Sequence, residues 1–189
     1  MLQCGAPGLL ELGGDEIKLF ADTGTGATYC PSAHMRCGLG IMRVREMLDA
    51  GVNVGLGVDG SASNDNSNLI EGVRHALMIN RLTYDAASVT HYDAFRWATE
   101  GSARCLGRDD IGAIKVGKMA DMAFYTLDEL RFSGAGDPLA ALVLCGAHSA
   151  DRVMIGGEWK VADGVPTGID IGELRYEHGQ AAKRFLESL

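Results

Sequence analysis

The sequence predicts an α/β protein whose first part resembles the last units of a parallel (β/α)8 TIM-type barrel and whose second part is a small β domain. Residues 52–58 form an apolar, β-branched run between polar flanks, which is typical of a buried parallel strand. Amphipathic helical patterns lie on both sides of this strand, whereas short strand-like segments separated by turns follow Gly107.

Three short elements are expected before the buried strand. A helix is predicted at 15–21 and a strand at 28–30, which Pro31 ends because proline cannot donate to a strand ladder. An amphipathic helix is predicted at 41–50, and Gly51 is its expected C-terminal stop. This alternation of strands and helices favours parallel pairing of the strands.

After the buried strand, a polar loop covers residues 59–66, and helices are predicted at 68–82 and 92–106. Each of these helices begins with a residue pair at capping-box spacing. The pairs are Asn68 with Glu71 and Thr90 with Asp93. We therefore assign residues 15–106 to the barrel-like part, behind an atypical N-terminal segment, 1–14.

The second part, 107–189, is predicted to be a β domain with a closing helix. Short strands are expected at 111–116, 120–125, 152–155 and 158–161. Gly156 and Gly157 are typical of a tight hairpin turn between the last two strands. Helices are predicted at 137–145 and, as a surface helix, at 171–189.

The chain carries 17 Lys and Arg against 25 Asp and Glu, which gives a formal net charge of -8. This balance disfavours nucleic acid as a partner, because phosphate binding needs a positive surface. No apolar run approaches the roughly 20 residues of a membrane span, and residues 1–10 lack the basic start of a signal peptide. Five cysteines without a Cys-x-x-Cys pair predict free thiols. We therefore expect a cytoplasmic protein with no nucleic-acid or membrane partner.

Asp59 is the main candidate for chemistry, because it ends the buried strand and opens a Gly-rich polar loop. Barrel enzymes keep catalytic groups at the carboxyl ends of strands, where a carboxylate can bind a divalent metal or accept a proton from water. The alternative is that Asp59 caps an Asp-Gly turn, and the local pattern alone favours that alternative. Gly55, Gly57 and Gly60 also spell a dinucleotide-binding pattern, but a polar loop continues where that fold needs a helix.

None of the histidines forms a His-x-His or His-Glu-x-x-His pair, so spacing indicates no metal site. The histidines are His34, His75, His91, His148 and His178. His34 follows the strand that Pro31 ends, so it is expected near the same barrel face as Asp59. We therefore take His34 as a candidate substrate contact, together with Ser61 in the loop, and interpret the other histidines as surface or core residues.

Four blocks of the sequence resemble the amidohydrolase superfamily, and they are most similar to its 8-oxoguanine, guanine and chlorohydrolase-like deaminases. The blocks are 23–26 with 29–32, 44–51, 55–65 and 112–121. Their order and spacing resemble the family from about Asp15 to the end of the chain. The Gly-Ser-Ala-Ser-Asn-Asp form of the third block looks most like the 8-oxoguanine deaminase branch.

The resemblance implies a metal-bearing (β/α) barrel together with a β-sandwich built from both chain ends. Residues 28–31 would end barrel strand seven, and residues 52–59 would be strand eight. Asp59 matches the family's metal-binding and water-activating Asp. The strands after Gly107 match the C-terminal part of the sandwich.

The resemblance also implies that this chain is a C-terminal fragment with an incomplete site for one divalent metal, zinc or iron. The family's other ligands are a His-x-His pair after strand one and single histidines after strands five and six. The first three would precede Met1, and the last should fall before Asp15, where residues 1–14 contain no His. The family usually has Asn at the position of His34. We therefore expect this chain alone to be inactive, with an open strand edge at 52–58.

The activity that the resemblance implies is hydrolytic deamination of an aromatic N-heterocycle, with 8-oxoguanine or a related purine as substrate and ammonia as a product. A triazine-type chloro- or aminohydrolase is the alternative reaction. An alternative of another class is a truncated, catalytically inactive chain or an assembly partner. A homo-oligomer is one possible state of the full-length form.

Overall fold

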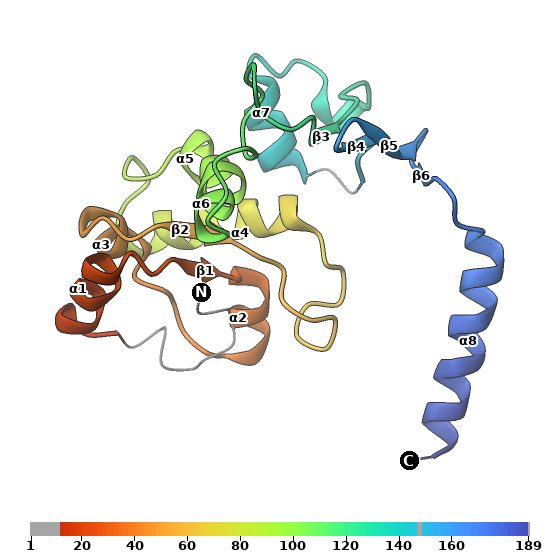
Figure 1. Ribbon diagram of the computed structural model, residues 1–189, viewed down its shortest axis with the longest axis horizontal. Helices are drawn as coiled ribbons and strands as arrows, with labels where there is room; N and C mark the ends of the chain where they lie inside the picture. The colour runs from red at the N-terminus through yellow and green to blue at the C-terminus, as the bar shows by residue number, and fades with distance from the viewer. Residues whose placement is uncertain (1–11, 147–148, 189) are drawn as a thin grey trace.

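The computed structural model describes residues 12–146 and 149–188, which contain two separate sheets, the first with helices around it and the second nearer the carboxyl-terminal end of the chain (Figure 1). One sheet is a parallel pair, β1–β2, and the other has four antiparallel strands in the order β3-β4-β5-β6. The mixed α/β class expected from the sequence is confirmed. Most of the expected segment 1–14 lies outside the described residues, and so does His148.

The first half of the chain alternates helices with the two parallel strands. Its elements are α1 (Gly14–Thr23), β1 (Ala27–Tyr29), α2 (Pro31–Cys37), α3 (Val44–Asp49), β2 (Val54–Leu56), α4 (Leu69–Thr83) and α5 (His91–Arg96). A π-helical turn, Trp97–Gly101, and α6, Ser102–Cys105, continue α5. The helices and strands predicted in this half are confirmed, and only the helix at 41–50 and the strand at 52–58 are shorter than predicted. The sequence did not predict α2, in which Pro31 is well placed because proline suits the first helical turn.

The second half contains short elements and one long terminal helix. They are β3 (Met122–Phe124), a 3₁₀ turn (Leu130–Phe132), α7 (Pro138–Ala141), a π turn (Leu142–Gly146), β4 (Arg152–Ile155), β5 (Glu158–Ala162), β6 (Val165–Pro166) and α8 (Ile171–Glu187). Gly156 and Gly157, with φ of 59° and 84°, make the predicted hairpin turn between β4 and β5. In Figure 1, α8 extends away from the rest of the chain, and none of its described residues is buried.

The strand predicted at 111–116 is wrong, because this segment is a loop. Gly112 has a φ of 84° and packs so closely on the helix before it that a Cβ would lie 2.8 Å from the Ala103 side chain. Met119 closes the loop with a backbone hydrogen bond to Asp110 O, at 2.8 Å. The apolar pattern therefore belongs to a loop in which Ile114 is 83% exposed. None of the described strands pairs with this loop.

Two further expectations from the sequence need correction or a limit. Cys30 is disulfide-bonded, so the expectation of free thiols is wrong for this residue, although Cys37, Cys105 and Cys145 are free. Among the described residues, none of the helices is both long and apolar enough to cross a bilayer.

The parallel pair lies at the centre of the main hydrophobic core. Ala27 pairs with Val54 and Tyr29 pairs with Leu56, and all four side chains are buried. Helices α1, α3 and α4 cover them with apolar side chains. These include Phe20, Val44, Met47, Val73 and Leu77.

The expected open edge on β2 is not found, because a side chain covers it. Gly57 donates its N–H to Tyr29 O, so the N–H and C=O of Leu56 point away from β1. The Ser102 hydroxyl accepts from Leu56 N at 3.1 Å and lies 3.0 Å from Leu56 O. The same hydroxyl lies 3.1 Å from Trp97 O within the π turn. The start of α6 therefore takes the place of a third strand at this edge.

Gly101 allows this close approach of helix and strand. A Cβ at Gly101 would lie 2.1 Å from Val54 O, and one at Gly55 would lie 2.8 Å from the Ser102 Cα. Two glycines facing one another across the contact are needed, because any side chain would push the π turn off the strand.

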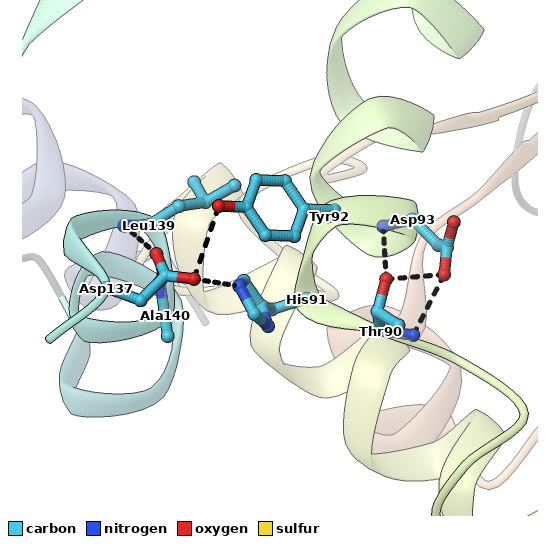
Figure 2. Close-up of polar contacts among 7 residues, drawn as sticks. All are labelled: Thr90, His91, Tyr92, Asp93, Asp137, Leu139 and Ala140. Carbon is cyan, nitrogen blue, oxygen red and sulfur yellow. Dashed lines mark hydrogen bonds and ion pairs between the residues drawn. The ribbon is translucent and has the colours of Figure 1, made fainter.

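The second half of the chain is joined to α5 through Asp137 (Figure 2). Asp137 Oδ1 accepts from the backbone N–H groups of Leu139 and Ala140 and so caps α7. Its Oδ2 lies 2.9 Å from His91 Nε2 and accepts from the Tyr92 hydroxyl at 3.2 Å. These hydrogen bonds, led by the one from Ala140, lower the pKa of Asp137. One carboxylate thus begins a helix and connects it to α5.

We expect Ser102→Ala to lower the free energy of unfolding by about 1–3 kcal/mol, since it leaves the buried N–H and C=O of Leu56 without a partner. Chemical denaturation followed by circular dichroism measures the change. Ser61→Ala is the matched control, because Ser61 is exposed. Equal stability of the two variants would show that water satisfies the edge of β2.

We expect Gly101→Ala to lower the free energy of unfolding by about 3 kcal/mol, because the new Cβ overlaps Val54 O. Gly179→Ala in α8 is the control, since none of the described atoms outside its own turns of the helix backbone and its two chain neighbours lies within 4 Å of its added Cβ. The control should gain roughly 0.5–1 kcal/mol from helix propensity. Thermal melts of both variants test the contact, and a neutral Gly101→Ala would contradict it.

Candidate functional site

Asp59 lies just beyond the C-terminal end of β2, as the sequence predicted, and its side chain is exposed. Its backbone has a φ of 64°, a left-handed conformation that is uncommon outside glycine but is tolerated by Asp. Asp59 Oδ1 accepts from Gly60 N at 2.7 Å. No hydrogen bond within the described chain engages Oδ2, so this oxygen is available to a ligand or a proton.

The loop after Asp59 is fixed by its own side chains. Asn64 is buried and donates through Nδ2 to Val58 O at 2.9 Å, next to Asp59. The backbone N–H of Asn64 also bonds Gly60 O, which closes a tight turn around the carboxylate. An ion pair between Arg36 and Asp65 connects the loop to α2. The position of Asp59 is therefore set by contacts on both of its sides.

His34 lies on α2 and is only 4% exposed, so the structure buries a residue expected at the mouth of the site. Its ring centroid lies 5.2 Å from that of Tyr29, and its Nδ1 has no hydrogen-bond partner within residues 12–146 and 149–188. Burial lowers the pKa of His34, whereas the nearby charge of Asp59 raises it by a smaller amount. The two predicted residues are thus close enough to interact, and the imidazole is neutral at pH 7.

Ser61, the third predicted site residue, is exposed in the same loop as Asp59. No hydrogen bond in the described part of the chain joins it to Asp59 or His34. Its hydroxyl is free to meet a ligand, but the structure gives it no fixed direction.

A polar network near the site was not predicted from the sequence. The Ser32 hydroxyl lies 3.0 Å from His75 Nδ1, and His75 Nε2 lies 3.7 Å from Glu71. Glu71 also accepts a hydrogen bond from Asn66 in the loop. Burial is the main cause that lowers the pKa of His75. The network connects α2, α4 and the loop. The sequence pattern could not predict it, because Ser32 and His75 are far apart along the chain.

The described residues do not make a complete metal site. Within residues 12–146 and 149–188, no group of three or more His, Cys, Asp or Glu side chains could hold a metal ion. Zinc sites in proteins use three or four protein ligands, and Asp59 supplies one carboxylate. Any metal bound at Asp59 therefore needs ligands from other residues.

Comparison with known proteins defines the class of this chain. The amidohydrolase family profile matches residues 7–160. The chain therefore belongs to the amidohydrolase family, as its sequence blocks had indicated.

Among curated relatives, the chain is 50% identical to the 8-oxoguanine deaminase of Pseudomonas aeruginosa over 177 residues. It is 38% identical over 166 residues to a hydroxydechloroatrazine ethylaminohydrolase of Pseudomonas sp. strain ADP. These alignments cover 94% and 84% of this chain but only 39% and 34% of the relatives. The chain thus spans well under half the length of the curated relatives it matches.

Solved structures give the same picture. An adenosine deaminase from Xanthomonas campestris with bound zinc superposes with a TM-score of 0.88 at 29% identity, over 93% of this chain and 41% of that one. The atrazine chlorohydrolase from Arthrobacter aurescens, complexed with zinc, has a TM-score of 0.84 at 34% identity, over 89% and 38% of the two chains. The family fold and its association with a divalent metal are therefore supported.

We expect the melting temperature to fall as the pH is lowered through about 6.5, the ordinary pKa of histidine. Burial lowers the pKa of His34 and His75 in the folded chain, so the unfolded chain binds more protons in this range. His34→Asn and His75→Asn should each flatten the dependence. Melts recorded across this range test the sign, and an unchanged slope in both variants would contradict it.

Proposed function

We propose that this chain is the carboxyl-terminal part of a metal-dependent hydrolase that deaminates an aromatic N-heterocycle, with 8-oxoguanine or a related purine as substrate. One observation carries the proposal: Asp59 follows a buried parallel strand, with one carboxylate oxygen unengaged and His34 beside it. The 50% identity to an 8-oxoguanine deaminase supports the purine. On this basis residues 15–106 are the last units of a (β/α)8 barrel, and residues 107–189 are part of a β-sandwich.

Asp59 would act as the general base. Water adds to the ring carbon that bears the amino group, and the carboxylate takes the proton that the water loses. The same carboxyl then returns a proton to the departing nitrogen, so that ammonia leaves and a ring carbonyl remains. Water thus supplies the oxygen of the product, the hydrogen that completes ammonia and a second hydrogen, which moves from the added hydroxyl to the neighbouring ring nitrogen.

His34 and Ser61 would contact the substrate. A neutral, buried imidazole can donate or accept one hydrogen bond without introducing a charge, which suits an uncharged heterocycle. Ser61 is exposed next to Asp59 and can offer a hydroxyl to a ring substituent.

One divalent metal, zinc or iron, would complete the site with ligands from outside the described residues. The zinc in two structural neighbours supports this assignment. Because the described residues do not form a metal site, we derive no step of the reaction through the metal. This chain alone is then expected to be inactive.

Triazine hydrolysis is the second candidate, since both a triazine-type aminohydrolase and a chlorohydrolase are among the matched proteins. The same base and water would displace an alkylamine or chloride from the ring. An inactive chain or an assembly partner remains the alternative of another class. A cytoplasmic location, a homo-oligomeric full-length form and the lack of nucleic-acid or membrane partners stay predictions.

The proposed function is tested by joining this chain to the remaining part of the P. aeruginosa 8-oxoguanine deaminase, of which it covers 39%. We expect the fusion to release ammonia from 8-oxoguanine faster than from a triazine. Asp59→Asn keeps the size of the side chain but removes its basicity, and should lower turnover by about 10²- to 10⁴-fold. The order of the two substrates decides between purine and triazine.

His34→Asn in the same fusion restores the residue that the family usually has there, and we expect turnover to stay within about tenfold of the parent. Ammonia release and KM for 8-oxoguanine are measured for both variants. A dead His34→Asn together with a nearly normal Asp59→Asn would overturn the assignment of the base and point to His34 instead.

A further inference from the structure

A cavity of about 300 Å³ opens between α3, α4 and the start of α5. It includes Asn80, which lies eleven residues into α4, whereas the loop of Asp59 enters α4 at its first residue. At 1.5 Å per residue, roughly 16 Å of helix separates the two ends. The cavity is therefore distinct from the candidate site.

One side of the cavity is apolar and aromatic. Trp97, only 8% exposed, and the buried Val89 line it, and Leu48 of α3 lies at a more exposed position. An indole face is the strongest aromatic partner for a cation among protein side chains. This wall thus favours a flat or cationic ligand over a purely aliphatic one.

The wall also holds a buried acceptor without a donor. Asn80 is 1% exposed and donates through Nδ2 to Ala76 O at 2.8 Å, but its Oδ1 has no partner among the residues that the structure describes. Leaving such an oxygen unpaired in the interior is costly. Asn80 is among the residues that line the cavity, so a bound N–H donor that displaces the cover of this oxygen gains a hydrogen bond that the described residues do not provide.

The rim of the cavity carries more negative than positive charge. Asp49 and Asp93 line it together with a single cation, Arg45. Arg45 Nε lies 3.6 Å from Asp49 Oδ2, and both side chains are at least half exposed. Their ion pair is therefore weak and easily broken. The rim therefore favours the entry of a cation.

We propose that this cavity binds a small, flat organic cation with N–H donors, of the amidine or guanidine class. The cation lies on the Trp97 indole, directs an N–H toward Asn80 Oδ1 and is neutralised by Asp49. The site is independent of the proposed deaminase activity, because it shares no residue with Asp59, His34 or Ser61.

Benzamidine is a suitable probe, and the chain offers its own reporter. The sequence has two tryptophans, so Trp159→Phe leaves Trp97 as the single tryptophan, which is excited selectively over tyrosine. We expect a saturable change in Trp97 fluorescence with an affinity of about 1 mM, as befits a ligand of this size. Benzamide, which has the same shape without the charge, should bind about tenfold more weakly, and benzoate should not bind.

Variants separate binding from folding. Asn80→Leu keeps the branched shape of the side chain but removes the acceptor, and Asp49→Asn removes one rim charge. Each should weaken benzamidine binding about tenfold. Leu48→Phe narrows the cavity from its more exposed wall and should abolish binding without touching the core. Asp109→Asn, the same charge change at an exposed position away from the cavity, is the matched control. Circular dichroism confirms that each variant is folded.

Three results would overturn the proposal. They are no saturable signal at benzamidine concentrations up to about 10 mM, binding of benzoate as strong as that of benzamidine, and unchanged binding in both Asn80→Leu and Leu48→Phe. If Asn80→Leu fails to fold, Leu48→Phe decides the outcome alone.

Discussion

The Ser102 hydroxyl gives Leu56 the hydrogen bonds that a third strand would otherwise provide at the free edge of β2. The first sheet has only two strands, and a parallel pair exposed on an edge is poorly protected against other chains. The π turn solves this by bringing Gly101 against Val54 O, at a distance that no other residue type allows. Everything at the C-terminal end of β2 depends on this contact, because it fixes the strand from which Asp59 follows.

The site is built outward from that fixed strand. Asp59 keeps an unusual left-handed backbone because its neighbours hold it: Val58 O is bonded by the buried Asn64, and Gly60 N bonds the Asp59 carboxylate. The loop then reaches α4 through Asn68, whose side chain accepts from the first free N–H groups of the helix. The Asp59 carboxylate is therefore positioned by local contacts. This explains why the carboxylate has a defined position in a chain that covers well under half the length of its relatives.

The sequence predicted well those features that depend on local patterns. The apolar run around β2, the cap at Thr90 and the Gly-Gly hairpin each depend on neighbouring residues, and all are found. The strand predicted at 111–116 is wrong because Gly112 packs on Ala103. This contact joins residues of different elements, and the pattern of neighbouring residues does not indicate it.

For the site, the sequence located Asp59 at a strand end but gave no sign that His34 is buried or that Ser32 pairs with His75. Both facts arise from the packing of α2 against α4. In the sequence, Pro31 indicates only the end of a strand and not the start of α2. The π turn was equally hidden, since its widened backbone is selected by contact with β2 and not by the propensity of its residues.

Magnitudes decide what the positioned carboxylate can do. Free water is a far weaker acid than a carboxylic acid, whose ordinary pKa is about 4, so proton transfer from free water to a carboxylate is strongly uphill. No arrangement of one carboxylate and one neutral imidazole offsets a difference of that size. A metal ion that brings the pKa of bound water close to neutrality removes most of this difference in acidity. The described residues contain no cluster that could hold such a metal ion. On the proposed function, Asp59 would therefore accept a proton from water that another part of a complete amidohydrolase activates.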